Sequence, residues 1–384
     1  MKLKLYMFGH ATIRTNASTS LSMTKAAAFF SGALLFSSHC FSQDTSKVSR
    51  PEFSGYVDAY GAYYTDSVGA GNFQKFPSVS PRSNQLGLNV AMFTVKYATD
   101  RVRSVVTLHF GDIPRSTWDA AYNYVQEANA GIRLCKKWWL DAGFFRTHFG
   151  TESLFPKENI TSSVSVCTFF EPYFEAGLKL NYSPNDKLSA SFFLLNGYNI
   201  YTENNNKKSI GLLLTYSFND KLNIGYSNYT GDDSPVGDTL SHLRIHNNIF
   251  INAMPGKFKI QVGGDFCYQE HSYISDPKKS ATMFAGVASL KYQCCKNAAL
   301  YTRGEIFNDP QGFMGGTFID KKGVVTGLKL WGATLGVEYK PVDNAYIRLE
   351  CRSLMTDPDQ EIFRWNGENE DSRMEVMLHM GVSF

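Results

Sequence analysis

Charged residues recur at every second position in several segments of the chain. In the run Arg348-Leu349-Glu350-Cys351-Arg352, basic and acidic side chains share one parity, and Leu and Cys take the other. Successive side chains of a β-strand point to opposite faces, so this spacing places the charges together on one face. Such a face could line a water-filled passage and set its ion selectivity. Opposite charges could instead pair across neighbouring strands and stiffen a wall, which we expect for most individual residues.

This polar face carries both signs of charge along the chain. An Arg or Lys that faces lipid at the bilayer midplane costs about 2–4 kcal/mol, so a shared parity opposite apolar residues indicates a wet interior. The candidate pore-lining residues are Arg103, Glu127, Arg133, Asp141, Glu175, Lys179, Arg244, Asp265, Arg303, Glu305, Glu338, Arg348, Glu350, Arg352, Arg373 and Glu375.

Sequence patterns for catalysis or metal binding are not found. There is no Gly-x-Ser-x-Gly motif and no ordered Ser/His/Asp constellation for a hydrolase. The cysteines lack the CxxC or Cys/His spacing of zinc sites, and His242 and His246 lack the helical spacing of a metalloprotease pair. The acidic segment 356–372 lacks the ligand spacing of an EF-hand. We therefore expect no catalytic residue, no bound metal and no cofactor.

The elements that must position the charged face are short segments with two-residue periodicity. In the last of them, Met374, Val376 and Leu378 alternate with Arg373, Glu375 and Met377. About 16 strands, give or take two, are predicted, with no helical stretch between them. They cover roughly 53–64, 85–97, 102–111, 124–134, 138–149, 175–182, 187–195, 208–218, 221–230, 242–253, 258–269, 282–292, 298–308, 327–340, 345–352 and 373–384. The pattern of 85–97 changes phase midway, which indicates a β-bulge.

The connections between these strands alternate in length. The long ones lie near 65–84, 112–123, 150–172, 196–207, 231–241, 270–281, 309–326 and 356–372. The short ones lie at 98–101, 135–137, 183–186, 219–220, 254–257, 293–297 and 341–344, and are rich in hairpin residues. Strict alternation in an up-and-down meander puts all long loops at one end, as in outer-membrane barrels with long outer loops and short periplasmic turns.

Aromatic residues end the apolar face beside the short turns. They are Trp138, Tyr182, Phe218, Phe258, Tyr292, Tyr339 and Phe384. Aromatic rings favour the bilayer interface, so this row predicts a periplasmic membrane girdle. Open sheet edges in hydrocarbon would leave backbone groups unpaired, so the sheet must close. The fold class predicted is therefore all-β, a transmembrane antiparallel up-and-down β-barrel.

Composition and the N-terminus agree with an exported membrane protein. Aromatic residues make up 14% and charged residues 19%, which excludes a disordered chain. The longest apolar run, 26–36, is too short for a spanning helix. We expect an N-terminal extension and signal peptide over 1–42, a periplasmic lead-in over 43–52, and the barrel over 53–384. Without 1–42, 34 basic and 35 acidic residues remain, which does not favour a nucleic-acid partner.

Several short motifs resemble those of Gram-negative outer-membrane β-barrel porins, in particular the putative β-barrel porin family. They are the opening run 55–60 (GYVDAY), Ala142-Gly143 leading into 150–152 (GTE), Asn196-Gly197, Arg348-x-Glu350-x-Arg352 and the terminal Phe384. The resemblance implies a bacterial outer-membrane location, contact with outer-membrane lipid, and passive uptake of small hydrophilic solutes. It also implies assembly by the barrel-assembly machinery through the C-terminal strand ending in Phe384, and is compatible with a homo-trimer.

The third long loop of general porins folds inward and narrows the channel. The segment 150–172 is the third long loop here, so Glu152, Lys157 and Glu158 are candidates for the constriction. An ordinary surface loop is the alternative. For the whole protein, the alternatives are an outer-membrane barrel enzyme of lipase or protease type, a non-conducting receptor or adhesin, and a soluble exported β-protein. Neither the solute nor the charge selectivity follows from the sequence.

Overall fold

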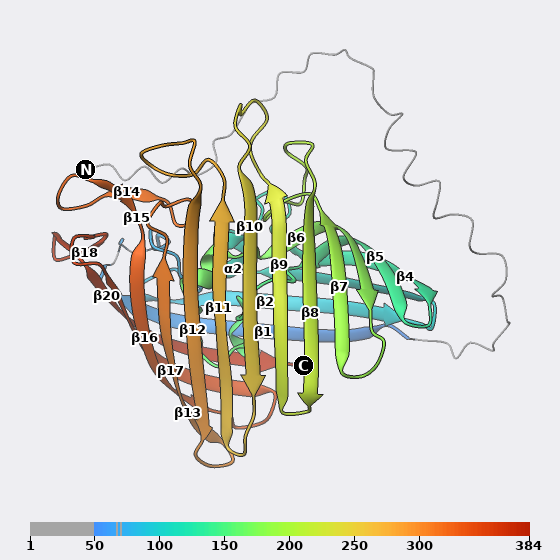
Figure 1. Ribbon diagram of the computed structural model, residues 1–384. Helices are drawn as coiled ribbons and strands as arrows, with labels where there is room; N and C mark the ends of the chain where they lie inside the picture. The colour runs from blue at the N-terminus through green and yellow to red at the C-terminus, as the bar shows by residue number, and fades with distance from the viewer. Residues whose placement is uncertain (1–49, 67, 70) are drawn as a thin grey trace. The chain divides into compact units, whose positions relative to one another are not determined.

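Sixteen antiparallel strands form a closed barrel (Figure 1). The computed structural model describes residues 50–66, 68–69 and 71–384, so the predicted signal peptide and most of the lead-in lie outside the described residues. The barrel strands are β1 (Glu52–Tyr64), β2 (Gln85–Ala98), β3 (Val102–Phe110), β4 (Val125–Cys135), β5 (Trp138–Arg146), β6 (Phe174–Tyr182), β7 (Leu188–Leu195), β8 (Ser209–Asn219), β9 (Leu222–Asp232), β10 (Leu243–Ala253), β11 (Phe258–Gln269), β12 (Ala281–Gln293), β13 (Ala298–Asn308), β16 (Lys329–Tyr339), β17 (Ala345–Thr356) and β20 (Ser372–Ser383). Each predicted strand is confirmed, most of them to within three residues at either end.

The first and last strands close the barrel. β1 pairs with β20 from Tyr56 opposite Ser383 to Tyr64 opposite Glu375. The backbone N–H of Gly55 donates to the carbonyl of Phe384 at 2.8 Å. Closure leaves no open edge among the barrel strands, which a bilayer would not tolerate.

The bulge predicted in 85–97 is confirmed. Asp58 lies opposite Val90 and Ala59 opposite Leu88, so Asn89 is the extra residue of β2. The Asn89 side chain turns into the barrel, is fully buried, and donates to Asp58 Oδ1 at 2.9 Å. The bulge therefore adds an inward-pointing polar side chain at the seam of the barrel.

The connections confirm the predicted alternation of long loops and short turns. The short turns gather at one end of the barrel and the long loops at the other (Figure 1). The long loops carry short elements that the periodicity did not indicate, because three to six residues are too few to show a period. These are α2 (Asp112–Thr117), the 3-10 turns Pro156–Glu158 and Cys167–Phe170, and the hairpins β14 (Thr317–Ile319) with β15 (Val325–Gly327) and β18 (Phe363–Trp365) with β19 (Glu368–Glu370).

The outer face of the barrel is apolar across its strands. Leu335 on β16 is 68% exposed, and exposed Val, Ile, Leu and Phe side chains continue onto the neighbouring strands. A soluble protein rarely exposes so continuous an apolar surface, whereas a membrane barrel presents it to lipid. Within the described residues, no helix is both long and apolar enough to cross a bilayer.

The predicted girdle residues lie at the strand ends beside the short turns. The Trp138 and Tyr182 rings stack at 4.3 Å between centroids, and Phe258 and Tyr292 lie 5.0 Å apart on β11 and β12. Phe218, Tyr339 and Phe384 are more than half exposed. Their contact with the bilayer interface stays a prediction.

A charge placed on the apolar face should destabilise the folded barrel in lipid. We expect Leu335→Arg to lower the free energy of unfolding by about 2–4 kcal/mol, because this position lies near the middle of β16. The control Val342→Arg, in the exposed 341–344 turn, should change it by at most about 1 kcal/mol. Denaturant unfolding in phospholipid vesicles, followed by tryptophan fluorescence, measures both. Two equally small effects would contradict the lipid-facing assignment.

Candidate channel lumen and its constriction loop

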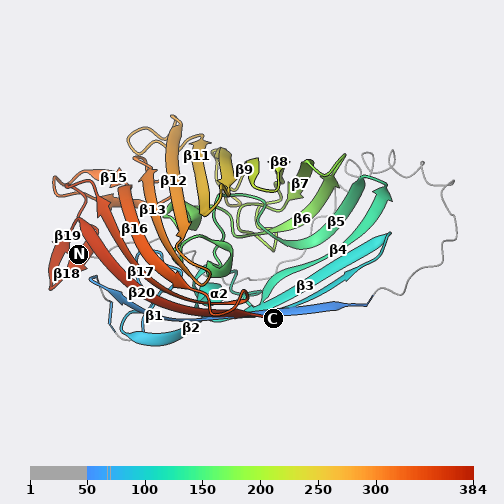
Figure 2. The same cartoon turned by 90° about the horizontal axis from the view of Figure 1, so that it is seen from below.

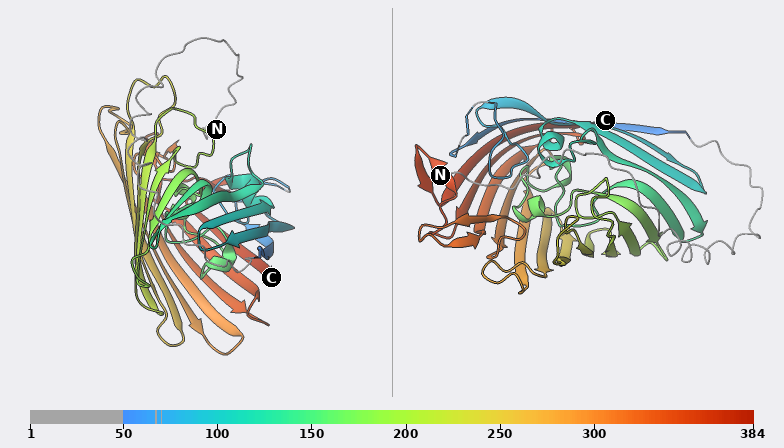
Figure 3. Two further views of the ribbon diagram at one scale, coloured as in Figure 1. Left: turned by 90° about the vertical axis from the view of Figure 1, so that its right-hand side faces the viewer. Right: turned by 90° about the horizontal axis from the view of Figure 1, so that it is seen from above.

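The third long loop, residues 147–173 (hereafter L3), folds into the barrel. Seen along the barrel, L3 lies within the ring of strands (Figures 2 and 3). From 148 to 172 only Lys157 and Glu158 are exposed. The predicted inward path of this loop is therefore observed. Buried backbone groups must find hydrogen-bond partners, and the strands facing L3 supply them.

Arg303 on β13 is the first anchor of L3. Its Nη1 donates to the carbonyl of Ser163 at 2.7 Å and to Thr161 Oγ1 at 2.9 Å. The same guanidinium pairs with Glu152 of L3 at 3.2 Å. Because Arg303 is only 1% exposed, its charge is stabilised by these partners rather than by water.

Arg348 on β17 is the second anchor. Its Nη1 donates to the carbonyls of Pro156 at 2.8 Å and Thr161 at 3.1 Å, and its Nη2 donates to that of Asn159 at 3.2 Å. Its Nε donates to Glu338 Oε2 at 2.8 Å, which balances the charge. One side chain thus holds three backbone carbonyls of the loop.

Two carboxylates hold the backbone N–H groups of L3. Glu350 accepts from Ser162 N at 2.6 Å and from Ser163 N at 3.0 Å. Glu305 accepts from Val166 N at 2.7 Å. Charge-assisted hydrogen bonds of this kind are roughly twice as strong as neutral ones. Both carboxylates therefore hold the backbone of L3 in one position inside the barrel.

The remaining charges of this wall pair with one another. Arg352 bonds to Glu305 at 2.8 Å and lies 3.4 Å from Glu375, which also pairs with Arg373. Arg373 in turn lies 3.3 Å from Asp66 in the first long loop. The candidate pore-lining residues of β13 to β20 are at most 5% exposed. They lie on the inner face, as their parity indicates, and are covered by loops.

A cavity of about 480 Å³ lies on the other side of L3, against β4 to β6. The candidates Glu127 and Lys179 line it from the wall, and the candidates Glu152 and Glu158 line it from L3. The lining also includes Trp118, Phe145, Arg146, Thr147, Phe149, Thr151, Ser153, Leu154, Phe155, Asn159, Thr168, Glu171, Pro172, Tyr173 and Gln261. The third constriction candidate, Lys157, instead lies over the Tyr56 ring, with its Nζ 4.5 Å from the ring centroid.

The acidic groups that L3 brings to this cavity differ in their environments. Burial opposes ionisation of Glu158, but its ion pair with Arg146 holds the pKa of the carboxyl below the ordinary value. Burial, together with the nearby Asp265 and Glu152, raises the pKa of Glu171 well above its ordinary value. The exposed Glu158 of L3 is therefore ionised, whereas burial makes ionisation of Glu171 unfavourable.

The other candidate pore-lining residues have partners on the inner wall. Arg103 Nε donates to Asp141 Oδ1 at 2.6 Å, and Glu175 lies 2.7 Å from His148 of L3. Arg244 bonds to Gln269 at 2.7 Å, Asp265 bonds to Asn248 at 3.1 Å, and the exposed Arg133 lies over the Trp139 ring at 5.8 Å. Of the sixteen candidates, the eight on β13 to β20 form the wall that anchors L3, whereas only Glu127 and Lys179 line the cavity.

A glycine on the inner wall leaves room for L3, and sequence reasoning missed it. A Cβ at Gly263 would lie 1.9 Å from Thr151 Oγ1, closer than any real contact. Its neighbour Gly264 has the outward parity, and a Cβ there meets no atom nearer than 3.4 Å. Gly263 shares the inward face of β11 with the polar residues Gln261 and Asp265, and this position in the alternation could have identified it from the sequence.

Ser80, His379 and Asp58 form a hydrogen-bonded chain that the sequence did not indicate. Ser80 Oγ lies 3.1 Å from His379 Nε2, and His379 Nδ1 lies 3.0 Å from Asp58 Oδ1. Sequence spacing could not indicate this arrangement, because His379 lies about 300 positions after the other two residues. All three side chains are fully buried, and none lines the 480 Å³ cavity. In this position they tie the first long loop to the β1–β20 seam.

Comparisons with solved structures agree with this fold. An anion-selective porin from Comamonas acidovorans has a TM-score of 0.59 at 10% identity, over 88% of this chain and 100% of that chain. The outer membrane channel DcaP of Acinetobacter baumannii has a TM-score of 0.57 at 11% identity, over 88% and 97%. The in-vitro folded trimer form of OmpT of Vibrio cholerae has a TM-score of 0.54 at 12% identity, over 88% and 100%. Identities this low establish the shared barrel fold alone.

A family comparison is more specific. Among curated proteins, none matches this chain in sequence. The family described as "Putative beta-barrel porin-2, OmpL-like" matches residues 51–384, which is the whole barrel. The chain therefore belongs to the putative beta-barrel porin-2, OmpL-like family of outer-membrane proteins.

Proposed function

We propose that this protein is a passive outer-membrane channel for small hydrophilic solutes or ions, which pass along the cavity between L3 and β4 to β6. The observation that carries the proposal is L3, which crosses the lumen of a closed 16-strand barrel and leaves a charged cavity of about 480 Å³ beside it. A barrel of this strand number can enclose an aqueous channel, whereas about eight strands are filled by their own side chains. Transport of this kind needs no covalent step.

The charges around the cavity favour a weak selectivity by sign. Glu158 is paired with Arg146, and Glu152 with Arg303, so these pairs add little net field. Glu127 and Lys179 carry opposite charges on the wall of β4 and β6. They therefore create a field across the passage rather than a ring of one sign. The anion selectivity of the Comamonas acidovorans porin belongs to that protein and is not transferred here.

The outer face and the terminal strand of the barrel indicate what the protein contacts in the membrane. We propose contact of the apolar outer face with outer-membrane lipid, and assembly by the barrel-assembly machinery through β20. The Phe384 ring covers Gly55 on β1, where a Cβ would lie 2.2 Å from the ring, so the terminal aromatic packs at the seam. A homo-trimer is a further proposal, supported by the trimer form of the OmpT neighbour.

Crowding L3 should reduce conductance. In planar bilayers, we expect the refolded protein to give discrete, salt-dependent current steps. Leucine at Gly263 would push L3 away from β11 toward the cavity, so Gly263→Leu should give smaller steps. Gly264→Leu, the same change with its side chain toward lipid, should leave the step size unchanged. Silence of the wild type despite verified insertion would favour a receptor or adhesin. Equal steps in both variants would contradict the proposed path.

Reversing a charge at the cavity should change ion selectivity. Lys179→Glu alters the local charge by two units, which at about 8 Å from a passing ion in water is worth about 1 kcal/mol. We therefore expect the cation-to-anion permeability ratio to rise by roughly fivefold or more. The reversal potential in a salt gradient measures this ratio. Lys221→Glu, in an exposed short turn, is the matched control and should have little effect. A shift of equal size in the control would place the ion path elsewhere.

A hydrolase is the second candidate function, and the Ser80–His379–Asp58 chain is the observation that favours it. The hydrogen bonds have the order that activates a serine nucleophile. The burial of Ser80 argues against it, because a substrate must reach Oγ. We expect a fluorophosphonate probe to leave Ser80 unmodified in the folded protein, as measured by mass spectrometry. Labelling that His379→Ala abolishes would instead establish an activated serine.

A further inference from the structure

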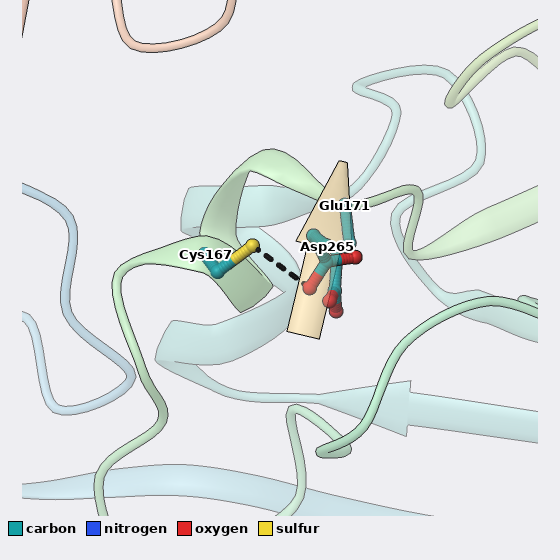
Figure 4. A group of neighbouring side chains, drawn as sticks. All are labelled: Cys167, Glu171 and Asp265. Carbon is teal, nitrogen blue, oxygen red and sulfur yellow. Dashed lines mark hydrogen bonds between the residues drawn. The ribbon is translucent and has the colours of Figure 1, made fainter. Parts of the chain in front are cut away.

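Three buried side chains point their donor atoms at one another where L3 meets β11 (Figure 4). Cys167 and Glu171 come from L3 and Asp265 comes from β11, and one ligand atom of each lies within 4.8 Å of the others. Cys167 Sγ donates to Asp265 Oδ2 at 3.2 Å. None of the three is more than 7% exposed. By itself, this cluster would only be a costly group of acids.

His246 on β10 gives a second, independent observation. Its ring is fully buried, and its Nε2 lies 3.3 Å from Asp265 Oδ1 without a hydrogen-bond partner among the described residues. The hydrogen-bond chain on the other side of the ring explains why. Tyr198 donates its hydroxyl proton to the carbonyl of Phe170, and the Tyr198 oxygen lies 3.3 Å from His246 Nδ1.

That chain favours one tautomer of His246. Because Tyr198 donates its hydroxyl proton to Phe170, its oxygen is free to accept from His246 Nδ1–H. A neutral imidazole with the proton on Nδ1 has a bare lone pair on Nε2. This lone pair faces a carboxylate oxygen of Asp265, and two acceptors this close repel unless a proton or a metal ion lies between them. A ligating histidine is commonly oriented by such a hydrogen bond at its second nitrogen.

We propose that Cys167 Sγ, His246 Nε2 and the carboxylates of Glu171 and Asp265 bind one divalent transition-metal ion, with Zn²⁺ the best match. Zinc accepts sulfur, nitrogen and oxygen ligands in four-coordinate sites. Mg²⁺ and Ca²⁺ require oxygen ligands throughout, so the thiolate and imidazole disfavour them. This departs from our expectation of no metal, because the ligands come from separate segments and have no motif spacing.

The binding step balances in protons and charge. The Cys167 thiol and the Glu171 carboxyl both lose their protons to water as the metal bonds form, since the thiolate and the carboxylate are the ligands. Two ionised carboxylates and one thiolate then surround a doubly charged ion, which leaves a net charge of minus one. The metal thus offsets most of the charge that these buried ligands carry. Thr168 and Glu171 line the 480 Å³ cavity, so an ion can enter from the lumen.

The ion would fasten L3 to a part of the wall that the arginine anchors do not reach. Arg303 and Arg348 hold residues 156–163 against β13 and β17. The proposed site holds residues 167–171 against β10 and β11. This inference does not depend on the channel function, because a loop can be metal-bound whether or not the barrel conducts.

Co²⁺ titration of the refolded full-length protein tests the site. We expect one Co²⁺ per chain, a visible absorption spectrum of tetrahedral type, and a sulfur-to-cobalt charge-transfer band. Zn²⁺ should displace Co²⁺, whereas Mg²⁺ and Ca²⁺ should not. Cys167→Ser should lose the charge-transfer band, and Asp265→Asn should weaken binding. Cys267→Ser, which removes another buried thiol outside the proposed ligand set, should leave both unchanged.

Folding of each variant is checked by its heat-modifiable mobility on gels, so that loss of the band is read only from folded protein. The absence of a thiolate band in the folded wild type would overturn the proposal. So would a band that persists in Cys167→Ser or disappears in Cys267→Ser. Conductance measured on the same samples keeps this result separate from the proposed function, since either can fail while the other holds.

Discussion

The closing of the sheet through β1 and β20 is the constraint on which the rest of the structure depends. A bilayer leaves no backbone group of an edge strand unpaired, so sixteen strands must form a ring rather than a sheet. The ring sorts side chains by parity: apolar ones meet lipid and charged ones point inward. It also creates an interior that something must fill. In this protein a loop of the chain fills much of it.

Filling the interior with L3 creates a second problem, because loop backbone is polar and lacks a regular pattern of its own hydrogen bonds. Charged side chains on the wall from β13 to β20 supply the hydrogen-bond partners that the loop backbone needs. Arg303 and Arg348 donate to carbonyls of L3, while Glu305 and Glu350 accept from its N–H groups. A buried ion pair is weak support for stability. What these charges provide is a single position for the loop.

The sequence predicted the barrel well and the lumen only in part. Strand parity and loop length are local properties, so all sixteen strands and a bulge within 85–97 could be predicted, whereas the inward third loop was expected from the resemblance to general porins. Partners of the charges could not, because they are often backbone groups, such as Val166 N for Glu305. The chain from Ser80 through His379 to Asp58 joins residues about 300 positions apart. Local periodicity carries no information on such contacts.

The lumen of this barrel is asymmetric, and this decides which residues can control transport. Charges under L3 are paired and dry, so a substitution there acts on the position of the loop before it acts on an ion. Glu127 and Lys179 border the cavity instead, and their charge is felt directly by whatever passes. The alternation of side chains along the strands places both the charges under L3 and those at the cavity on the inner face. Only the position of L3 separates residues that shape the passage from residues that set its field.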